Sequence, residues 1–194
     1  MTLQLTKKHD FDIVYDAQKI FRLILEAMSN PGRIVSIKKY ADKLYGDDAA
    51  LLAVAMTLLD NEVSFCACKN YTLSDEIRTL TLAREEQAET ADFIFACEPE
   101  NIIERVKCGT LADPHKSATV IIRNDGSSDC MLKLYGPGIN GHKAVQVTRT
   151  VRDALILRDM QNYEYPQGID LIFVSSAGEL LAVPRLTRIL KEAD

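Results

Sequence analysis

One segment near the carboxyl end, residues 165–187, limits the possible folds more than any other part of the chain. Residues 169–174 form a near-continuous apolar run, which is typical of a strand that is covered on both faces of an α/β sheet. Residues 175–178 have the composition of a turn that ends in glycine, and residues 180–183 can return as a second strand. Because proline cannot donate to a sheet ladder, the prolines at 166 and 184 mark where pairing stops. The segment therefore predicts a buried β-hairpin.

Two charged residues belong to this hairpin. Asp170 is the lone charge inside the apolar block, and Arg185 follows the second strand immediately. In one interpretation Asp170 caps a neighbouring backbone group and Arg185 lies in solvent. In the other, both side chains point into a cleft at the sheet edge, where the arginine fork could bind an oxyanion. The sequence leaves both interpretations open.

Length, composition and charge indicate one globular domain over residues 1–194, with 47% hydrophobic and 26% charged residues. The net charge of -5 provides no reason to expect binding to nucleic acid or to an anionic membrane. Residues 1–10 lack the pattern of a secretory signal, and no apolar run has the length of a membrane span. The five cysteines fit reduced, buried thiols in a cytoplasmic protein.

Hydrophobic periodicity and turn residues predict an alternation of helices and strands. We expect helices over residues 12–29, 49–59, 74–82, 99–107 and 151–160, and strands over 33–37, 63–67, 91–97, 118–123 and 130–135. Residues 84–90 are expected to form a solvated connection, and 109–114 a loop. Asn124, Asp125 and Gly126 between two strands are a strong hairpin signal. Two late hairpins after alternating elements predict a three-layer α/β/α fold with a mixed sheet.

Residues 136–141 match the dinucleotide-binding pattern G-x-G-x-x-G, with glycines at 136, 138 and 141. A true fingerprint leads from a parallel strand into a helix whose free amides hold a pyrophosphate. Here the preceding strand is expected to belong to a hairpin, Pro137 removes one amide, and residues 144–147 do not resemble a helix start. We therefore interpret the run as a tight turn, and an oxidoreductase that binds a dinucleotide is disfavoured.

Cysteine and histidine patterns do not predict a metal or a catalytic centre. Cys66 and Cys68 form a C-x-C pair on one face of a strand, but no second pair has ligand spacing. His115 and His142 fall in predicted loops without a G-x-S-x-G motif nearby, so solvation is the favoured interpretation. We expect no metal and no cofactor.

Six segments, in this order along the chain, resemble the PhnH subunit of the bacterial carbon-phosphorus lyase system. They read D-A-Q-K-I-F-R-L-I-L-E-A-M-S-N-P-G (16–32), T-L-L-D (57–60), G-T-L-A-D-P (109–114), G-P-G-I (136–139), Y-P-Q-G-I-D-L-I-F (165–173) and L-L-A-V-P-R (180–185). Two positions depart from the family pattern. His115 stands where an acidic residue is expected, and Leu186 interrupts the usual P-R-T-T ending.

The resemblance implies a fold like the large domain of pyridoxal-phosphate transferases, without the cofactor. It also implies assembly with sister subunits G, I and J, joint action with subunit L, and a homodimer when the chain is isolated. The complex is thought to displace adenine from ATP with a phosphonate, which yields ribose 1-phosphonate 5-triphosphate, and the chemistry is attributed mainly to subunit I. This chain would then be a structural and interaction subunit.

The alternative is an independent enzyme or binding protein for a small anionic substrate. The candidate residues for anion binding or for an interface are Arg22, Asp170, Arg185, Gly136 and Gly138. No residue is assigned a catalytic role, and the preferred phosphonate and the stoichiometry of the complex are left open.

Overall fold

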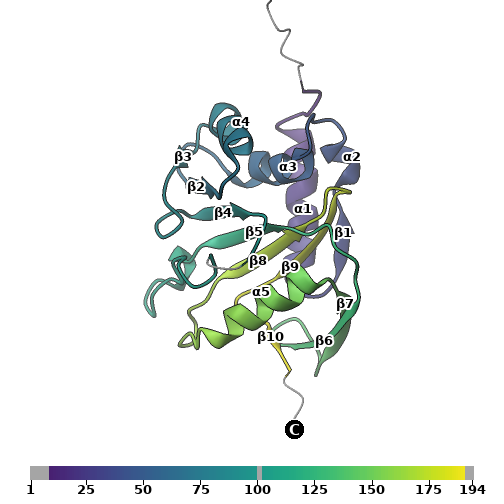
Figure 1. Ribbon diagram of the computed structural model, residues 1–194, viewed down its shortest axis with the longest axis vertical. Coiled ribbons are helices and arrows are strands. Elements are labelled where there is room, and N and C mark those ends of the chain that lie inside the picture. The colour runs from purple at the N-terminus through teal and green to yellow at the C-terminus, as the bar shows by residue number, and fades with distance from the viewer. Residues whose placement is uncertain (1–8, 100–101, 191–194) are drawn as a thin grey trace, which may run out of the picture.

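A seven-stranded sheet organises the molecule (Figure 1). The structure is a computed structural model, and it describes residues 9–99 and 102–190. The expectation about a secretory signal therefore falls almost wholly outside the described residues, as does part of the short helix that was predicted at 99–107.

The strand order confirms a mixed sheet in an α/β fold. From one edge to the other the strands are β1 (Ile34–Ser36), β9 (Glu179–Val183), β8 (Asp170–Val174), β5 (Thr119–Arg123), β4 (Phe93–Ala96), β2 (Ser64–Ala67) and β3 (Arg84–Glu85). β9 is antiparallel to both of its neighbours, whereas the strands from β8 to β3 run parallel. The apolar character of β8 follows from this position, since all five of its residues are buried.

The hairpin that was predicted near the carboxyl end is confirmed. β8 and β9 pair in register from Leu171 opposite Val183 to Val174 opposite Leu180. Gly178 in the turn has φ +79°, and a Cβ there would lie 2.6 Å from the Cα of Lys38. Only glycine fits this left-handed position so close to another backbone segment.

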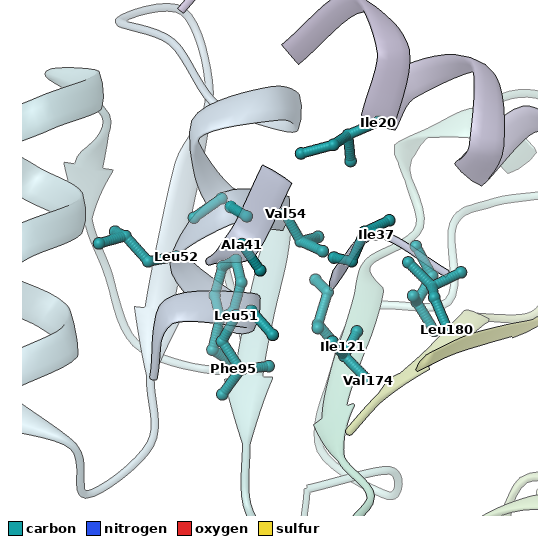
Figure 2. Close-up of a cluster of buried hydrophobic side chains, with 14 of the residues drawn as sticks. Ile20, Ile37, Ala41, Leu51, Leu52, Val54, Phe95, Ile121, Val174 and Leu180 are labelled. Atoms are coloured by element: carbon teal, nitrogen blue, oxygen red, sulfur yellow. The ribbon is translucent and has the colours of Figure 1, made fainter. Parts of the chain in front are cut away.

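Four helices cover one face of the sheet: α1 (Tyr15–Ser29), α2 (Lys38–Ala41), α3 (Ala49–Leu58) and α4 (Tyr71–Thr81). Their apolar side chains meet those of the sheet in one core, where Leu51 and Val54 of α3 lie near Phe95, Ile121 and Val174 (Figure 2). Residues 50–55 of α3 are all buried, as its uninterrupted apolar sequence predicted.

Two features of this face differ from the predictions. Helix α4 begins at Tyr71 because the Asn70 side chain accepts a hydrogen bond from Leu73 N–H. Ser74, the predicted start, is buried inside the helix and donates to Glu85. On α1, helical spacing groups Phe21 with Ile20 and Ile24 on one apolar face, but Phe21 is 44% exposed whereas the other two are buried.

The opposite face carries α5 (Arg149–Met160) and a second sheet in the order β10 (Arg188–Ile189), β6 (Cys130–Tyr135) and β7 (Lys143–Val147). The prediction of a hairpin through residues 124–126 is wrong. β5 pairs with β4 and β8 in the large sheet, whereas β6 pairs with β7. One outer layer therefore consists of a helix and a small sheet rather than of helices alone.

Residues 84–118 contain further differences. The connection predicted at 84–90 includes the edge strand β3, and residues 102–105 form turns where a helix was expected. A short 3₁₀ helix, η1 (Pro114–Lys116), follows the predicted loop.

No helix in the described part of the chain combines the length and the apolar character needed to cross a membrane.

Candidate functional site

Asp170 and Arg185 form an ion pair where the β8–β9 hairpin leaves the large sheet. Arg185 Nη2 lies 2.6 Å from Asp170 Oδ2, and Arg185 Nε lies 3.4 Å from Oδ1. The backbone N–H of Arg185 donates to the same Oδ1 at 2.8 Å, and Arg185 Nη1 donates to the carbonyl oxygen of Pro114. The carboxylate and the guanidinium therefore satisfy each other in a forked geometry.

Each of the two interpretations of Asp170 and Arg185 is correct in part. Asp170 does cap a backbone N–H, but the Arg185 side chain is only 21% exposed and does not lie in solvent. Both residues do line a pocket of about 360 Å³, but the guanidinium is already bound to a carboxylate. The pocket is lined by Met28, Ser29, Pro137, Gly138, Asp170, Pro184, Arg185, Leu186 and Thr187.

The glycines of the G-x-G-x-x-G run lie beside this pocket. The run forms the turn between the antiparallel strands β6 and β7, so it does not lead into a helix. Gly138 has φ +83°, and a Cβ there would lie 2.9 Å from Ser29 O. At Gly136 a Cβ would lie 2.7 Å from Leu186 O. The two glycines let this turn pack closely against the end of α1 and against the carboxyl-terminal segment.

Arg22 does not join the other candidate residues. Its side chain is exposed on α1, and it is not among the residues that line the pocket. It precedes Met28 by six residues, which corresponds to about 9 Å along the helix axis. The structure therefore gathers Asp170, Arg185, Gly136 and Gly138 at one place and leaves Arg22 on the outer surface.

Arg158 on α5 stabilises the chain around the pocket, and sequence reasoning missed it. Its side chain is fully buried, and its guanidinium donates to the carbonyl oxygens of Val183, Pro184 and Thr187. Asp159 Oδ1 lies 3.1 Å from Arg158 Nη2. Burial lowers the pKa of Arg158 below its usual value, while the neighbouring carboxylate opposes this change. An Arg-Asp pair on a moderately amphipathic helix gives no sign in the sequence of such burial.

One hydroxyl beside the pocket has no hydrogen-bond partner among the described residues. Thr187 is fully buried and its Oγ1 is unpaired, although Thr187 lines the pocket. An unpaired buried hydroxyl costs about 1–3 kcal/mol, so it is an uncommon feature at the wall of a pocket.

A second pocket, of about 230 Å³, lies at the carboxyl ends of β5 and β8. Asn124, Asp125, Thr148 and Ser176 are among the residues that line it. Open α/β sheets bind ligands at this edge. Its polar groups are largely engaged with one another, since Ser176 N–H donates to Asp125 and Thr148 Oγ1 accepts from Val151 N–H at the start of α5. The sequence assigned residues 124–126 to a hairpin, so this pocket was not predicted.

Metal-ligating side chains do not converge in the described ranges, where no group of three or more His, Cys, Asp or Glu could hold a metal ion. His115 and His142 are both exposed. The five cysteines are free thiols, but the expectation that they are buried is wrong, since Cys97 is exposed and the other four are half-buried.

An apolar stripe is exposed along α1. Val14, which immediately precedes the helix, and Phe21 and Leu25 within it are 66%, 44% and 48% exposed. They recur at helical spacing, and we refer to these three residues as the α1 stripe. The other side of the helix is buried through Ile20, Ile24 and Ala27. The helix is therefore apolar on the side that faces the core and also along part of its outer side.

Comparisons with known proteins identify the family. A family model described as "Bacterial phosphonate metabolism protein (PhnH)" matches residues 9–190. A curated relative from Stutzerimonas stutzeri, named "Putative C-P lyase subunit protein HtxG", is 33% identical over 173 residues, which cover 89% of this chain and 85% of that protein. Since the family model covers nearly the whole chain, the chain belongs to the PhnH family of bacterial phosphonate metabolism proteins.

Proposed function

We propose that this chain is a subunit of the carbon-phosphorus lyase core complex and acts there mainly as a structural and interaction subunit. The match to the PhnH family over residues 9–190 carries the proposal. Together with subunits G, I and L, the chain would support the transfer of a phosphonate onto the ribose of ATP, with release of adenine. The product of that reaction is ribose 1-phosphonate 5-triphosphate.

The α1 stripe supports an interaction role. Exposed apolar patches are typical of protein–protein contact sites. Phe21 and Leu25 lie one helical turn apart on the outer side of α1. The edges of the large sheet are poorer candidates, because β1 has three residues and β3 has two. Such short edge strands present few free backbone groups to a partner. We therefore propose that the α1 stripe contacts a sister subunit.

Co-purification tests both parts of this proposal. We expect tagged wild-type chain to recover subunits G, I and J from a co-expressing cell. The double variant Phe21→Glu, Leu25→Glu should fold normally but recover much less of them, because two charges in an apolar contact are costly to desolvate. A matched control is Ile156→Glu, Met160→Glu on α5, whose residues have the same spacing and are 43% and 65% exposed.

The two parts fail in different ways. If wild-type chain recovers none of the sister subunits, the complex itself is refuted. If the α1 variant recovers them as well as wild type does, only the assignment of the surface is wrong.

Further parts of the proposal concern the isolated chain. We propose that it resembles the large domain of pyridoxal-phosphate transferases in fold, binds no cofactor, dimerises and resides in the cytoplasm. Light scattering at several protein concentrations checks the dimer, and a constant monomer mass would contradict it. Superposition on an experimental structure of such a transferase checks the fold.

A second candidate function is binding or turnover of a small anion at the Asp170–Arg185 pocket. The unpaired hydroxyl of Thr187 favours it. We expect methylphosphonate to raise the melting temperature of the isolated wild-type chain but not of Thr187→Val. Methylphosphonate at 100 times its Kd would raise the free energy of unfolding by about 2.7 kcal/mol. Arg22→Ala, outside the pocket, should respond as wild type does, and an absent shift in wild type would rule this function out.

A further inference from the structure

Two thiols meet at the end of strand β2. Cys66 Sγ and Cys68 Sγ are 3.7 Å apart, and both side chains pack against the core on the α5 side of the sheet. Cys68 continues the ladder beyond β2, because its N–H donates to Phe95 O at 2.8 Å. Two residues of extended chain advance about 6.6 Å. This idealised separation lies at the upper end of the Cα–Cα range of roughly 4.4–6.8 Å that disulfides accept, so closing the 3.7 Å between the sulfurs to a bond requires the two cysteines to turn towards each other.

The pair is reachable from solvent. Both cysteines are half-buried. The neighbouring strand β3 pairs with Ser64 and Phe65, so its register ends before Cys66. The contact therefore lies past the end of the edge strand, where a small reagent can approach.

The charge state of the pair suits thiol exchange. A hydrogen bond from Cys68 lowers the pKa of Cys66 to about 7, although burial opposes this change. The negative charges of Glu85 and Glu89 raise the pKa of Cys66, and the positive charge of Arg105 lowers it. The pKa of Cys68 is raised, chiefly because its proton is shared with Cys66. Since the thiolate is the reactive form, Cys66 is the attacking sulfur and Cys68 the resolving one.

We propose that Cys66 and Cys68 form a reversible dithiol–disulfide site that reacts with small disulfides such as glutathione disulfide. The Cys66 thiolate attacks one sulfur of the oxidant, forms a mixed disulfide and releases one glutathione thiolate. Cys68 then loses its proton to solvent, attacks the Cys66 sulfur and releases the second glutathione. The two cysteines lose two electrons and two protons, which reduce the oxidant to two glutathione molecules. This site is independent of the proposed function.

Mass spectrometry of the full chain tests the site. Reduced protein is incubated with glutathione disulfide, the free thiols are alkylated, and the peptides are mapped. We expect the wild-type peptide that contains both cysteines to lose two hydrogen atoms and to escape alkylation, and dithiothreitol to restore both thiols. In Cys68→Ser, which lacks the resolving thiol, a mixed disulfide should accumulate on Cys66. Cys108→Ser is the matched control, because Cys108 is also half-buried against the same core, and it should behave as wild type does.

Exposed Cys97 serves as an internal standard for the oxidant. If Cys97 acquires glutathione while Cys66 and Cys68 both remain free, the proposal is refuted. It is also refuted if wild-type Cys66 holds glutathione stably without closing onto Cys68. Both outcomes are read on the wild-type chain, so the test does not depend on the folding of a variant.

Discussion

Arg158 is a residue whose loss should strongly destabilise the fold. Replacement by alanine would remove the guanidinium donor from the carbonyl oxygens of Val183, Pro184 and Thr187. It would also leave Asp159 with only one of its two guanidinium partners, because Arg158 and Arg188 each lie 3.1 Å from Asp159 Oδ1. Removing one partner of a buried ion pair costs about 3–5 kcal/mol. We therefore expect Arg158→Ala to lower the free energy of unfolding by about that amount, as measured by urea denaturation.

A control on the same helix separates burial from charge. Arg149 on α5 has a 74% exposed side chain and lies 3.4 Å from Asp129. Arg149→Ala removes the same charge from the surface, so its effect should stay within about 0.5 kcal/mol. An equal effect of the two substitutions would show that the hydrogen bonds of Arg158 do not stabilise the carboxyl-terminal segment.

At the scale of the element, α1 is anchored at its amino-terminal end by Asp16. Its buried carboxylate accepts hydrogen bonds from Lys43 Nζ at 2.8 Å and from Asp12 N–H. Burial alone would raise the pKa of Asp16, but Lys43 and the Asp12 backbone hold it below its ordinary value of 3.8. The ionised carboxylate also suits the positive end of the helix dipole.

This lowered pKa predicts how stability depends on pH. The unfolded chain takes up the Asp16 proton more readily, so the contribution is complete above pH 3.8 and is lost as pH falls through the folded pKa. We expect Asp16→Asn to be less stable than wild type at about pH 6 and the difference to shrink towards about pH 3. Urea unfolding of both proteins at each pH measures this difference in the free energy of unfolding. Asp42→Asn, at an exposed ion pair, is the control, and a pH-independent difference for Asp16→Asn would contradict the assignment.

At the scale of the whole molecule, two cores share one sheet. Along β5, Ile121 packs on the side of helices α1 to α4 and Val120 on the side of α5. Because every central strand belongs to both cores, neither core can unfold while the other keeps its strands. We therefore expect a single domain that unfolds cooperatively.

Substitutions in each core test this cooperativity. Leu52→Ala in α3 and Leu155→Ala in α5 both remove a fully buried side chain, and each should cost about 2–5 kcal/mol. Circular dichroism and the fluorescence of the seven tyrosines should report one common transition for each variant. Separate transitions would show that the two sides are independent folding units.

The parts of the fold that could be predicted from the sequence depend on neighbours along the chain. The β8–β9 hairpin was predicted correctly because its turn and both of its strands lie within one short segment. Helix α3 was predicted for the same reason, since its apolar run and its ends are local. The same local reasoning failed at residues 124–126, where a strong turn signal does not join two paired strands.

The candidate site shows the same division. Asp170, Arg185 and the glycines were named because they stand out within their own segments, and four of the five named residues do gather at one place. Arg22 lies apart from these four on the exposed side of α1, where its candidacy for an interface stays a prediction. Phe21 is also on that side, because helical periodicity does not show which flank of α1 meets the sheet.

The amino-acid sequence by itself determined the family, the mixed α/β class and the terminal hairpin, because these follow from motifs and local patterns. Only the tertiary structure decided which strands that are distant in the sequence pair, how Arg158 is buried and that two thiols are in contact at the end of β2. Pairing and burial depend on segments far apart in the chain, whose free energy of association is not encoded at any one position.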